Sequence, residues 1–519
     1  MSPKSTGPKS LLRSILGVSS ITLLSRVLGL LREMVRAALL GTSLYSDAFS
    51  LAFSLPNLFR RLTAEGAMSN AFIPVFCEAD KKDSRARALD FARSFFWILA
   101  LILTLLTLLF IWQADFLVAQ VFASGFSGEA LEATVFLTQV MFGYMILISL
   151  AAVAQGVLNS LGTFWVSALT PVLLNLAILG AALGMQGWFE NPALPFAIGV
   201  MLGGCLQLAF QLPYLHRAGF RLFKAGLYDP KIKEVFRLIL PTLFGVGIYQ
   251  INILISNLIA TTLGEGALSS LTFSNRLLEL VLGVFVVSIT TVILPRLSGH
   301  FIDEEPGKVV YSVRRTLSVI SFVTFPVTAL TLALAAPMVE LLFLRGQFDQ
   351  RSLDMTAGAL VFHIAGLSFI AYNRVFLAVY QSARRIQITV WISLAVMLAN
   401  LGGALWLSRS MGHLGIALAS SASQGLNLLL LWVFSKRLKV TGLLDRAFGL
   451  SLARSLGASV LIYWTLVQLL PLVASWPLVL GFLALSLVAV GQYLVLMVLL
   501  KSSELKETWG LLRARGKRP

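Results

Sequence analysis

Residues 12–74 decide the fold and read LRSILGVSSITLLSRVLGLLREMVRAALLGTSLYSDAFSLAFSLPNLFRRLTAEGAMSNAFIP. They form two apolar segments that are long enough to cross a membrane as helices. The charged residues within them are Arg26, Arg32, Glu33, Arg36, Asp47, Arg60, Arg61 and Glu65. A charged side chain at the centre of a membrane helix costs about 2.5 to 3.5 kcal/mol, so these residues are expected to face a wet cavity or a partner.

Helical spacing indicates which of these charges can pair. Glu33 lies seven residues after Arg26 on the same face of a helix, and Glu65 lies four residues after Arg61. Arg32 and Arg60 have no acid at such a spacing. The segment as a whole is therefore predicted to carry unmatched positive charge inside the membrane.

Depth separates these arginines into two groups. For Arg36 and Arg61, extension to the lipid headgroups at the membrane edge is as good an interpretation as a place in a cavity. Arg26 and Arg60 lie about 13 or 14 residues into their helices, roughly 20 Å from the end at 1.5 Å per residue. A cationic membrane cavity is first a site for an anionic substrate, and this is the function that the segment indicates.

The composition is that of an all-α, polytopic membrane protein. Of 519 residues, 57% are hydrophobic and 13% charged, with a mean hydropathy of +0.84, and the apolar residues come in unbroken runs rather than in short alternating strands. We predict 14 transmembrane helices near residues 13–40, 46–78, 92–118, 133–160, 164–187, 193–216, 233–262, 267–297, 311–336, 353–383, 386–408, 412–435, 447–470 and 476–500.

An internal echo predicts two six-helix lobes followed by two extra C-terminal helices. The segment AFIPVF around Pro74 ends the second predicted helix, and VILPRL around Pro295 ends the eighth. The predicted divisions are 1–222 for the N-lobe, 223–440 for the C-lobe and 441–519 for the last two helices with a basic tail. Repeated halves of transporters place the substrate site between them, near the membrane midplane.

The second lobe contributes one charged cluster, Arg276 with Glu279 at a spacing of i, i+3. This spacing allows a self-neutralised pair within one helix. The cluster also lies about nine residues into its predicted helix, deep enough to join the cavity of the first lobe. We predict that Arg276 joins it.

Loop charge predicts the topology. The net charge of +17 comes from helix ends and tails rather than from a basic patch interleaved with aromatic residues, so no nucleic-acid partner is expected. Loops on one side carry cations, among them Lys81, Lys82, Arg217, Arg221, Arg384 and Arg385. Loops on the other side carry the acids Asp115, Glu129, Glu132, Glu190 and Glu265. By the positive-inside rule, both termini are predicted to be cytoplasmic.

Motifs for nucleotide, metal or hydrolytic chemistry do not occur in the sequence. There is no GxxxxGK[ST] loop, no GxGxxG after a strand, no HExxH pair and no GxSxG elbow. The expectation is a protein that is not an enzyme and needs no cofactor or metal. A transporter of this kind must draw on a gradient, a potential or the substrate itself.

Five stretches of the sequence are distinctive: SRVLGLLRE (25–33), SDAFSLAFSLPNLFRRLTAEGAMSNAFIPVF (46–76), LNSLGTFWVSALTPVLLN (158–175), NRLLEL (275–280) and LFLRGQFD (342–349). Together they resemble the MurJ (MviN) family of lipid II flippases, in the multidrug/oligosaccharidyl-lipid/polysaccharide exporter superfamily. The resemblance covers essentially the whole chain. It implies a multi-pass protein of the bacterial inner membrane that carries the undecaprenyl-pyrophosphate-linked peptidoglycan precursor outward.

The resemblance also implies site residues. The family's cavity arginines fall on Arg26, Arg32, Arg60 and Arg276, its helix-two acid falls on Asp47, and we add Glu279 as the neighbour of Arg276. Where the family has an acid before the helix-eight arginine, this chain has Asn275. Where some members have acids for sodium, this chain offers only Asn252, Asn257 and Asn400.

The chemistry of lipid II suits this set of residues. A pyrophosphate carries about two negative charges, and arginine binds its oxygens with a planar fork that lysine cannot copy. The polyprenyl tail is expected to stay in hydrocarbon, where the two extra helices can wall a groove. The expected partners are lipid II and membrane lipids, with cell-wall synthesis enzymes as further candidates.

Two alternatives remain open at this point. A related polysaccharide-lipid or drug exporter would share the fold and differ in substrate, although a cation antiporter should line its cavity with acids. A non-transporting membrane scaffold for cell-wall enzymes would tolerate alanine at the buried arginines.

Overall fold

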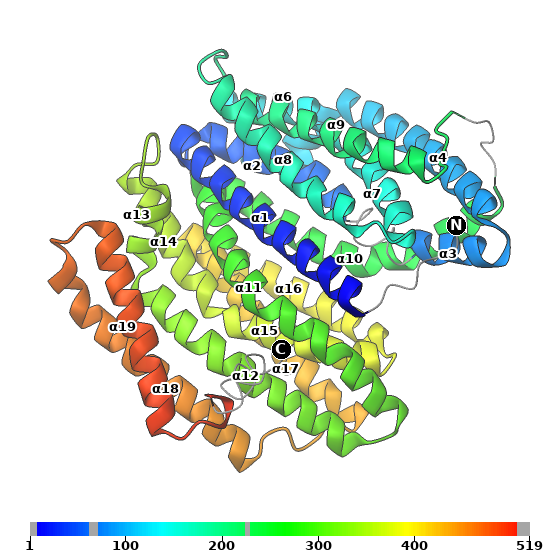
Figure 1. Cartoon of the computed structure of the whole chain (residues 1–519). Coiled ribbons are helices and arrows are strands. Elements are labelled where there is room, and N and C mark those ends of the chain that lie inside the picture. The colour runs from blue at the N-terminus through cyan, green and yellow to red at the C-terminus, as the bar shows by residue number, and fades with distance from the viewer. Residues whose placement is uncertain (1–7, 62–70, 224–228, 506–519) are drawn as a thin grey trace. The chain divides into compact units, whose positions relative to one another are not determined.

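The computed structural model describes residues 8–61, 71–223 and 229–505, and this part of the chain is helical without any strand (Figure 1). The predicted all-α fold is therefore confirmed. Two predicted features, Glu65 and the cytoplasmic tails 1–7 and 506–519, lie outside the described residues.

The chain divides into two compact units. Unit 1 comprises residues 1–269 and 345–348, and unit 2 comprises residues 270–344 and 349–519. The helices before the division are α1 (Pro8–Leu40), α2 (Leu44–Arg60), α3 (Ile73–Lys82), α4 (Arg85–Trp112), α5 (Ala114–Leu117), α6 (Gly128–Phe142), α7 (Tyr144–Ser160), α8 (Phe164–Gly184), α9 (Leu194–Arg217) and α10 (Lys231–Thr261). Those that follow are α11 (Ala267–Ile302), α12 (Pro306–Ala333), α13 (Ala335–Phe343), α14 (Gln350–Ala365), α15 (Leu367–Ser382), α16 (Ile386–Met411), α17 (His413–Ser435), α18 (Arg446–Leu469) and α19 (Leu478–Leu499).

This division lies at 269/270, whereas the sequence predicts a lobe boundary at 222/223. The difference is α10, which packs on unit 1. Ile232 and Val235 belong to the same buried cluster as Phe95 of α4, and the ring centroids of Phe95 and Phe236 lie 6.0 Å apart. Burial of this apolar face holds α10 against α4.

Unit 1 is built around close helix pairs. α1 packs along α8, α8 packs along α9, and α2 packs against α6 (Figure 1). The α8–α9 contact is closest at two glycines of α9: a Cβ atom added at Gly199 would lie 2.6 Å from Cα of Ile178, and one added at Gly203 would lie 2.5 Å from Cδ1 of Leu174. Small residues let membrane helices approach in this way.

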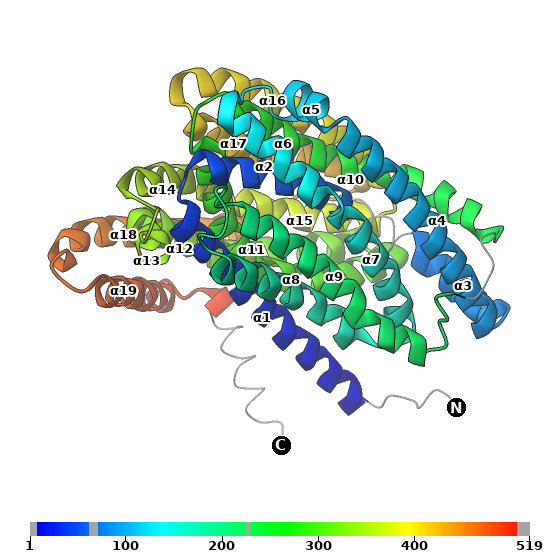
Figure 2. The same ribbon diagram turned by 90° about the horizontal axis from the view of Figure 1, so that it is seen from above.

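Unit 2 includes the two helices that the sequence places outside the repeat. α12 packs along α18, and α18 and α19 lie side by side in both views (Figures 1 and 2). Tyr493 of α19 donates a hydrogen bond of 2.7 Å to the carbonyl oxygen of Phe322 in α12. That carbonyl needs a partner because Pro326, four residues on, has no N–H to donate to it.

The predicted spans map onto these helices, with differences in where some of them begin and break. Among the described residues, nine helices are long and apolar enough to cross a membrane, or ten if α14 and α15, bent by 40°, form one span. The count of 14 spans stays a prediction. Within the predicted helix 46–78 the structure describes α2 and α3, and residues 62–70 between them lie outside the described residues. The predicted helix 92–118 begins earlier, at Arg85 of α4.

Candidate substrate-binding site

Three consecutive charged groups on α1 form the centre of the site. Nη2 and Nε of Arg32 lie 2.6 Å and 3.2 Å from Oε1 of Glu33. Nη2 of Arg36 lies 3.2 Å from Oε2 of the same carboxylate. The side chains of Arg32, Glu33 and Arg36 are 15%, 7% and 5% exposed. Two guanidinium groups and one carboxylate leave one formal positive charge in a largely buried position, which favours an anion.

A second helix orients Arg32. Asn175 of α8 is buried, and its Oδ1 accepts a hydrogen bond of 3.2 Å from Nη1 of Arg32. Its Nδ2 donates to the carbonyl oxygen of Ser25, about two turns earlier on α1, at 3.1 Å. An arginine has five N–H donors. Glu33 and Asn175 occupy three of them, which leaves one N–H on each terminal nitrogen of Arg32 for a ligand.

Aromatic rings of α2 lie beside both guanidinium groups. The guanidinium carbon of Arg32 is 6.0 Å from the ring centroid of Phe53, and that of Arg36 is 5.9 Å from the ring centroid of Phe49. The two rings are themselves stacked, with centroids 5.7 Å apart. Cation–π contacts of this length stabilise cations that have lost water.

The structure decides between the two interpretations of Arg36 and corrects the expected partner of Glu33. Arg36 does not extend to headgroups: it is 4% exposed and donates a hydrogen bond of 3.2 Å to Oγ of Ser50 on α2. Glu33 pairs with Arg32 and Arg36 rather than with Arg26. The reason is distance along the helix, because seven residues rise about 10 Å and three residues rise about 4.5 Å.

The other two predicted arginines of unit 1 lie on α1 and α2, and their place in a common site with Arg32 stays a prediction. Arg26 is half-buried on α1, six residues before Arg32. Arg60 lies at the last residue of α2, where its Nε donates a hydrogen bond of 2.7 Å to Oδ1 of Asn57. Arg61 continues with a helical backbone after Arg60, and residues 62–70 lie outside the described residues, so the continuous helix expected around Arg60 stays a prediction.

Asp47 has a different set of partners. It is 1% exposed and accepts hydrogen bonds of 2.7 Å from the backbone N–H groups of Gly266 and Ser269. These N–H groups at the start of α11 have no carbonyl partner within that helix. The Asp47 side chain, which comes from α2, therefore takes the place of an N-cap residue. Gly266 has a φ of +87°, and a Cβ atom there would lie 2.7 Å from the carbonyl oxygen of Thr42. A role of Asp47 in binding substrate stays a prediction.

Arg276 and Glu279 pair within α11, as the i, i+3 spacing allows. Nη1 of Arg276 lies 3.1 Å from Oε2 of Glu279, and the side chains are 34% and 38% exposed. Both residues belong to unit 2. Their meeting with the arginines of unit 1 stays a prediction.

Sequence reasoning missed Asn175, Ser50 and Phe53 as parts of the site. Asn175 could have been identified from the sequence, because an amide within an apolar helix is costly unless it has a hydrogen-bond partner. Ser50 and Phe53 did not, since serine and phenylalanine are ordinary in membrane helices.

Unit 2 also contains an apolar cavity of about 190 Å³ between α12, α18 and α19. Its lining includes Val323 and Pro326 of α12, Ile462 of α18 and Val490 of α19. No charged side chain lines it. It suits a hydrocarbon chain.

One group of possible metal ligands occurs in the described chain, at the turn between α11 and α12. His300, Asp303 and Glu305 bring ligand atoms within 4.8 Å of one another. Oε1 of Glu305 is 2.7 Å from Nζ of Lys308, so that carboxylate already has a cation. We interpret the group as an ion-paired turn.

The chain matches known proteins along most of its sequence. The family model described as "Lipid II flippase MurJ" matches residues 36–510. The "Probable lipid II flippase MurJ" of Treponema pallidum is 34% identical over 439 residues, which cover 82% of each chain. The "Lipid II flippase MurJ" of Burkholderia cenocepacia is 33% identical over 432 residues, which cover 82% of this chain and 83% of its own.

The fold matches solved membrane transporters. The structure titled "Lipid II flippase MurJ, inward closed conformation" has a TM-score of 0.77 at 23% identity, covering 93% of this chain and 98% of its own. An inward-facing multidrug resistance MATE family transporter of the MOP superfamily has a TM-score of 0.70 at 16% identity, covering 82% of this chain. Since the family model and the relatives from both organisms extend over most of its length, the chain belongs to the MurJ family of lipid II flippases.

Proposed function

We propose that this protein moves lipid II, the undecaprenyl-pyrophosphate-linked peptidoglycan precursor, from the cytoplasmic to the outer leaflet of the bacterial inner membrane for cell-wall synthesis. The observation that carries the proposal is the group of Arg32, Glu33 and Arg36. It holds one surplus positive charge within a membrane helix, and Arg32 keeps an N–H on each terminal nitrogen. Those two donors match two oxygens of a phosphate.

The other charged residues complete the proposed site. Arg26, Arg60 and Arg276 add cations for the second phosphate, while Asp47 and Glu279 hold the helices that carry them. Rocking of the two lobes would expose the site to each side of the membrane in turn. Since the sequence has no nucleotide-binding motif, the energy comes from a gradient, a potential or the substrate.

The cavity between α12, α18 and α19 is the proposed seat of the polyprenyl tail. Its lining lacks charge, and it lies in the helices outside the predicted repeat. Each buried CH₂ group gains about 0.8 kcal/mol relative to water, so a chain held there would not be drawn into the wet site. Both termini are proposed to be cytoplasmic, and cell-wall synthesis enzymes are the proposed protein partners.

Complementation tests the function. Cells depleted of their own lipid II flippase should grow when they produce this protein, and should lyse when they produce Arg32→Ala or Arg26→Ala at the same membrane level. Arg385→Ala is the matched control, because it removes an exposed arginine outside the site. Growth of both site variants would support a scaffold and contradict transport through these arginines.

A further inference from the structure

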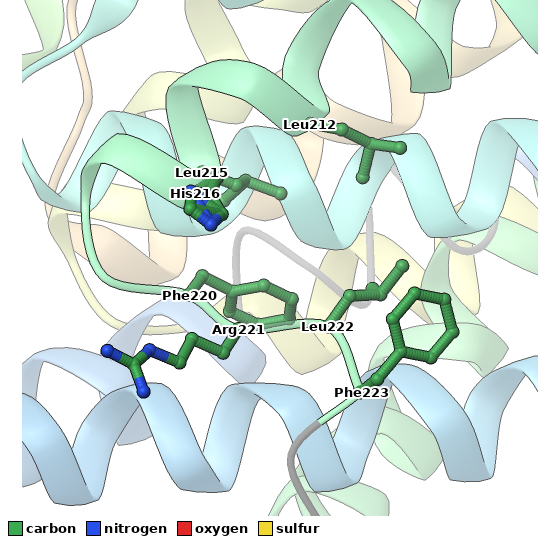
Figure 3. A pocket seen from close by; sticks show the side chains of 7 residues that line it. All are labelled: Leu212, Leu215, His216, Phe220, Arg221, Leu222 and Phe223. Atoms are coloured by element: carbon green, nitrogen blue, oxygen red, sulfur yellow. The ribbon is translucent and has the colours of Figure 1, made fainter.

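A larger cavity lies in unit 1, at the C-terminal end of α9. It has a volume of about 490 Å³, within the range of roughly 300 to 1,000 Å³ that small-molecule sites occupy. Figure 3 shows side chains of α9 on one side and of the following loop, residues 218–223, on the other. The lining residues are Leu212, Leu215, His216, Phe220, Arg221, Leu222 and Phe223.

The loop is tied to α4 through its backbone. Trp97 Nε1 donates a hydrogen bond of 2.8 Å to the carbonyl oxygen of Leu222, and Nη1 of Arg93 donates one of 3.5 Å to that of Arg221. The ring of Phe220 packs on Phe96 with centroids 6.1 Å apart. Backbone carbonyls and the Phe220 ring make these contacts, so they do not involve the Arg221 side chain.

The cavity has a cationic end and an aromatic end. In Figure 3, the Arg221 side chain extends to the left of the loop, and the Phe223 ring stands at the right end of the loop. Phe223 is 85% exposed, although its ring lies 6.0 Å from that of Trp97. His216, at the end of α9, adds a second nitrogen donor to the lining. A side chain as apolar as phenylalanine is stable at such exposure when lipid covers it.

We infer that this cavity binds an anionic phospholipid of the cytoplasmic leaflet, with its phosphate on Arg221 and an acyl chain against Leu212 and Phe223. Loop charge places residues 217–233 on the predicted cytoplasmic side, where anionic lipids supply the negative surface. The bound lipid holds the end of α9 and the loop to the membrane. This site is separate from the Arg32 centre, and the inference does not depend on the flippase function.

Native mass spectrometry of the full-length protein in detergent tests the inference. Delipidated protein is mixed with phosphatidylglycerol or with phosphatidylcholine, and the bound lipid is counted. We expect phosphatidylglycerol to be retained in preference, and Arg221→Gln to weaken its binding about fivefold, the effect of one cation near an anionic lipid. Leu212→Trp, which fills the cavity, should prevent retention of either lipid at this site.

Arg385→Gln is the matched control, since it removes an exposed arginine on the same predicted membrane face. The inference is wrong if Arg221→Gln retains as much phosphatidylglycerol as Arg385→Gln. It is equally wrong if Leu212→Trp leaves the number of bound lipids unchanged. Thermal unfolding of each variant separates loss of the site from loss of the fold.

Discussion

Asn175 accepts a hydrogen bond from Arg32 across 143 positions of sequence. The same amide donates a hydrogen bond to the carbonyl oxygen of Ser25, so one side chain of α8 is bonded to two different residues of α1. Glu33 holds the opposite edge of the guanidinium. The plane of Arg32 is therefore set by two partners on two helices, and its remaining donors have a defined direction.

Replacement of Asn175 by alanine should weaken lipid II binding about five- to tenfold. One hydrogen bond contributes about 1 kcal/mol, and without it the Arg32 guanidinium can turn on Glu33. Binding of purified lipid II to the detergent-solubilised protein measures the effect. Leu176→Ala is the control, because Leu176 is the next residue of α8 and is exposed. Equal affinities of the two variants would show that Asn175 does not position Arg32.

Arg36→Ala should lower the stability of the fold by about 1 to 3 kcal/mol, the cost of leaving buried polar partners without their hydrogen bonds. The sequence left open whether Arg36 extends to the headgroups, and its burial against Glu33 and Ser50 is the reason for this expected cost. Arg26→Ala, at a half-buried position, should instead abolish flipping while the protein stays folded. Thermal unfolding followed by size-exclusion chromatography compares the two. An Arg36→Ala protein as stable as the wild type would refute the argument.

Asp47→Ala should lower stability by about 1 to 2 kcal/mol or more, because N-cap loss costs about that amount and two buried N–H groups lose their acceptor. Asp47→Asn keeps one acceptor oxygen but places an amide N–H against a backbone N–H, so its stability should lie between those of alanine and wild type. Unfolding midpoints measure this order. If asparagine were as stable as aspartate, the charge of Asp47 would serve something other than capping.

Cysteine labelling tests the topology. In a protein whose native Cys77 and Cys205 are replaced by serine, Trp188→Cys in the exposed α8–α9 loop should react with an impermeant thiol reagent added outside the cell. Lys82→Cys, at the end of α3, should react only after permeabilisation. The reverse pattern would place both termini outside and contradict the loop-charge prediction.

Tyr493→Phe should destabilise the protein by about 1 to 3 kcal/mol, because it leaves the Phe322 carbonyl without a donor. The same change in a Pro326→Ala background should cost clearly less, since the new backbone N–H can bond that carbonyl within α12. Free energies of unfolding for the four proteins form a double-mutant cycle. Equal costs in both backgrounds would mean that Tyr493 acts through its other contacts.

Hydropathy predicted the apolar helices well where an apolar run and a helix coincide. The spans predicted at 164–187 and 386–408 are α8 and α16 in the structure. Hydropathy placed the start of α4 too late. The helix begins at Arg85, before the apolar run, because the Ser84 hydroxyl accepts a hydrogen bond from the N–H of Arg87 and caps the helix there. A hydropathy average does not detect the polar end of a helix that extends beyond its apolar run.

The same limit applies to the site. Spacing within one helix identified the charged residues of α1, and the self-pairing of Arg276 with Glu279 follows from it. It could not identify Ser50 or Asn175, which come from other helices. The burial of Arg36 and the orientation of Arg32 are therefore results of tertiary packing.

Glu33 has a consequence for how a substrate leaves. Its carboxylate already lies against both Arg32 and Arg36, so an arriving phosphate meets cations that are partly satisfied. Under the proposed function, a phosphate would meet the single positive charge that Glu33 leaves rather than two uncompensated arginines, so its departure would cost correspondingly less. A carrier needs this moderation, because a site that holds its ligand too firmly has no turnover.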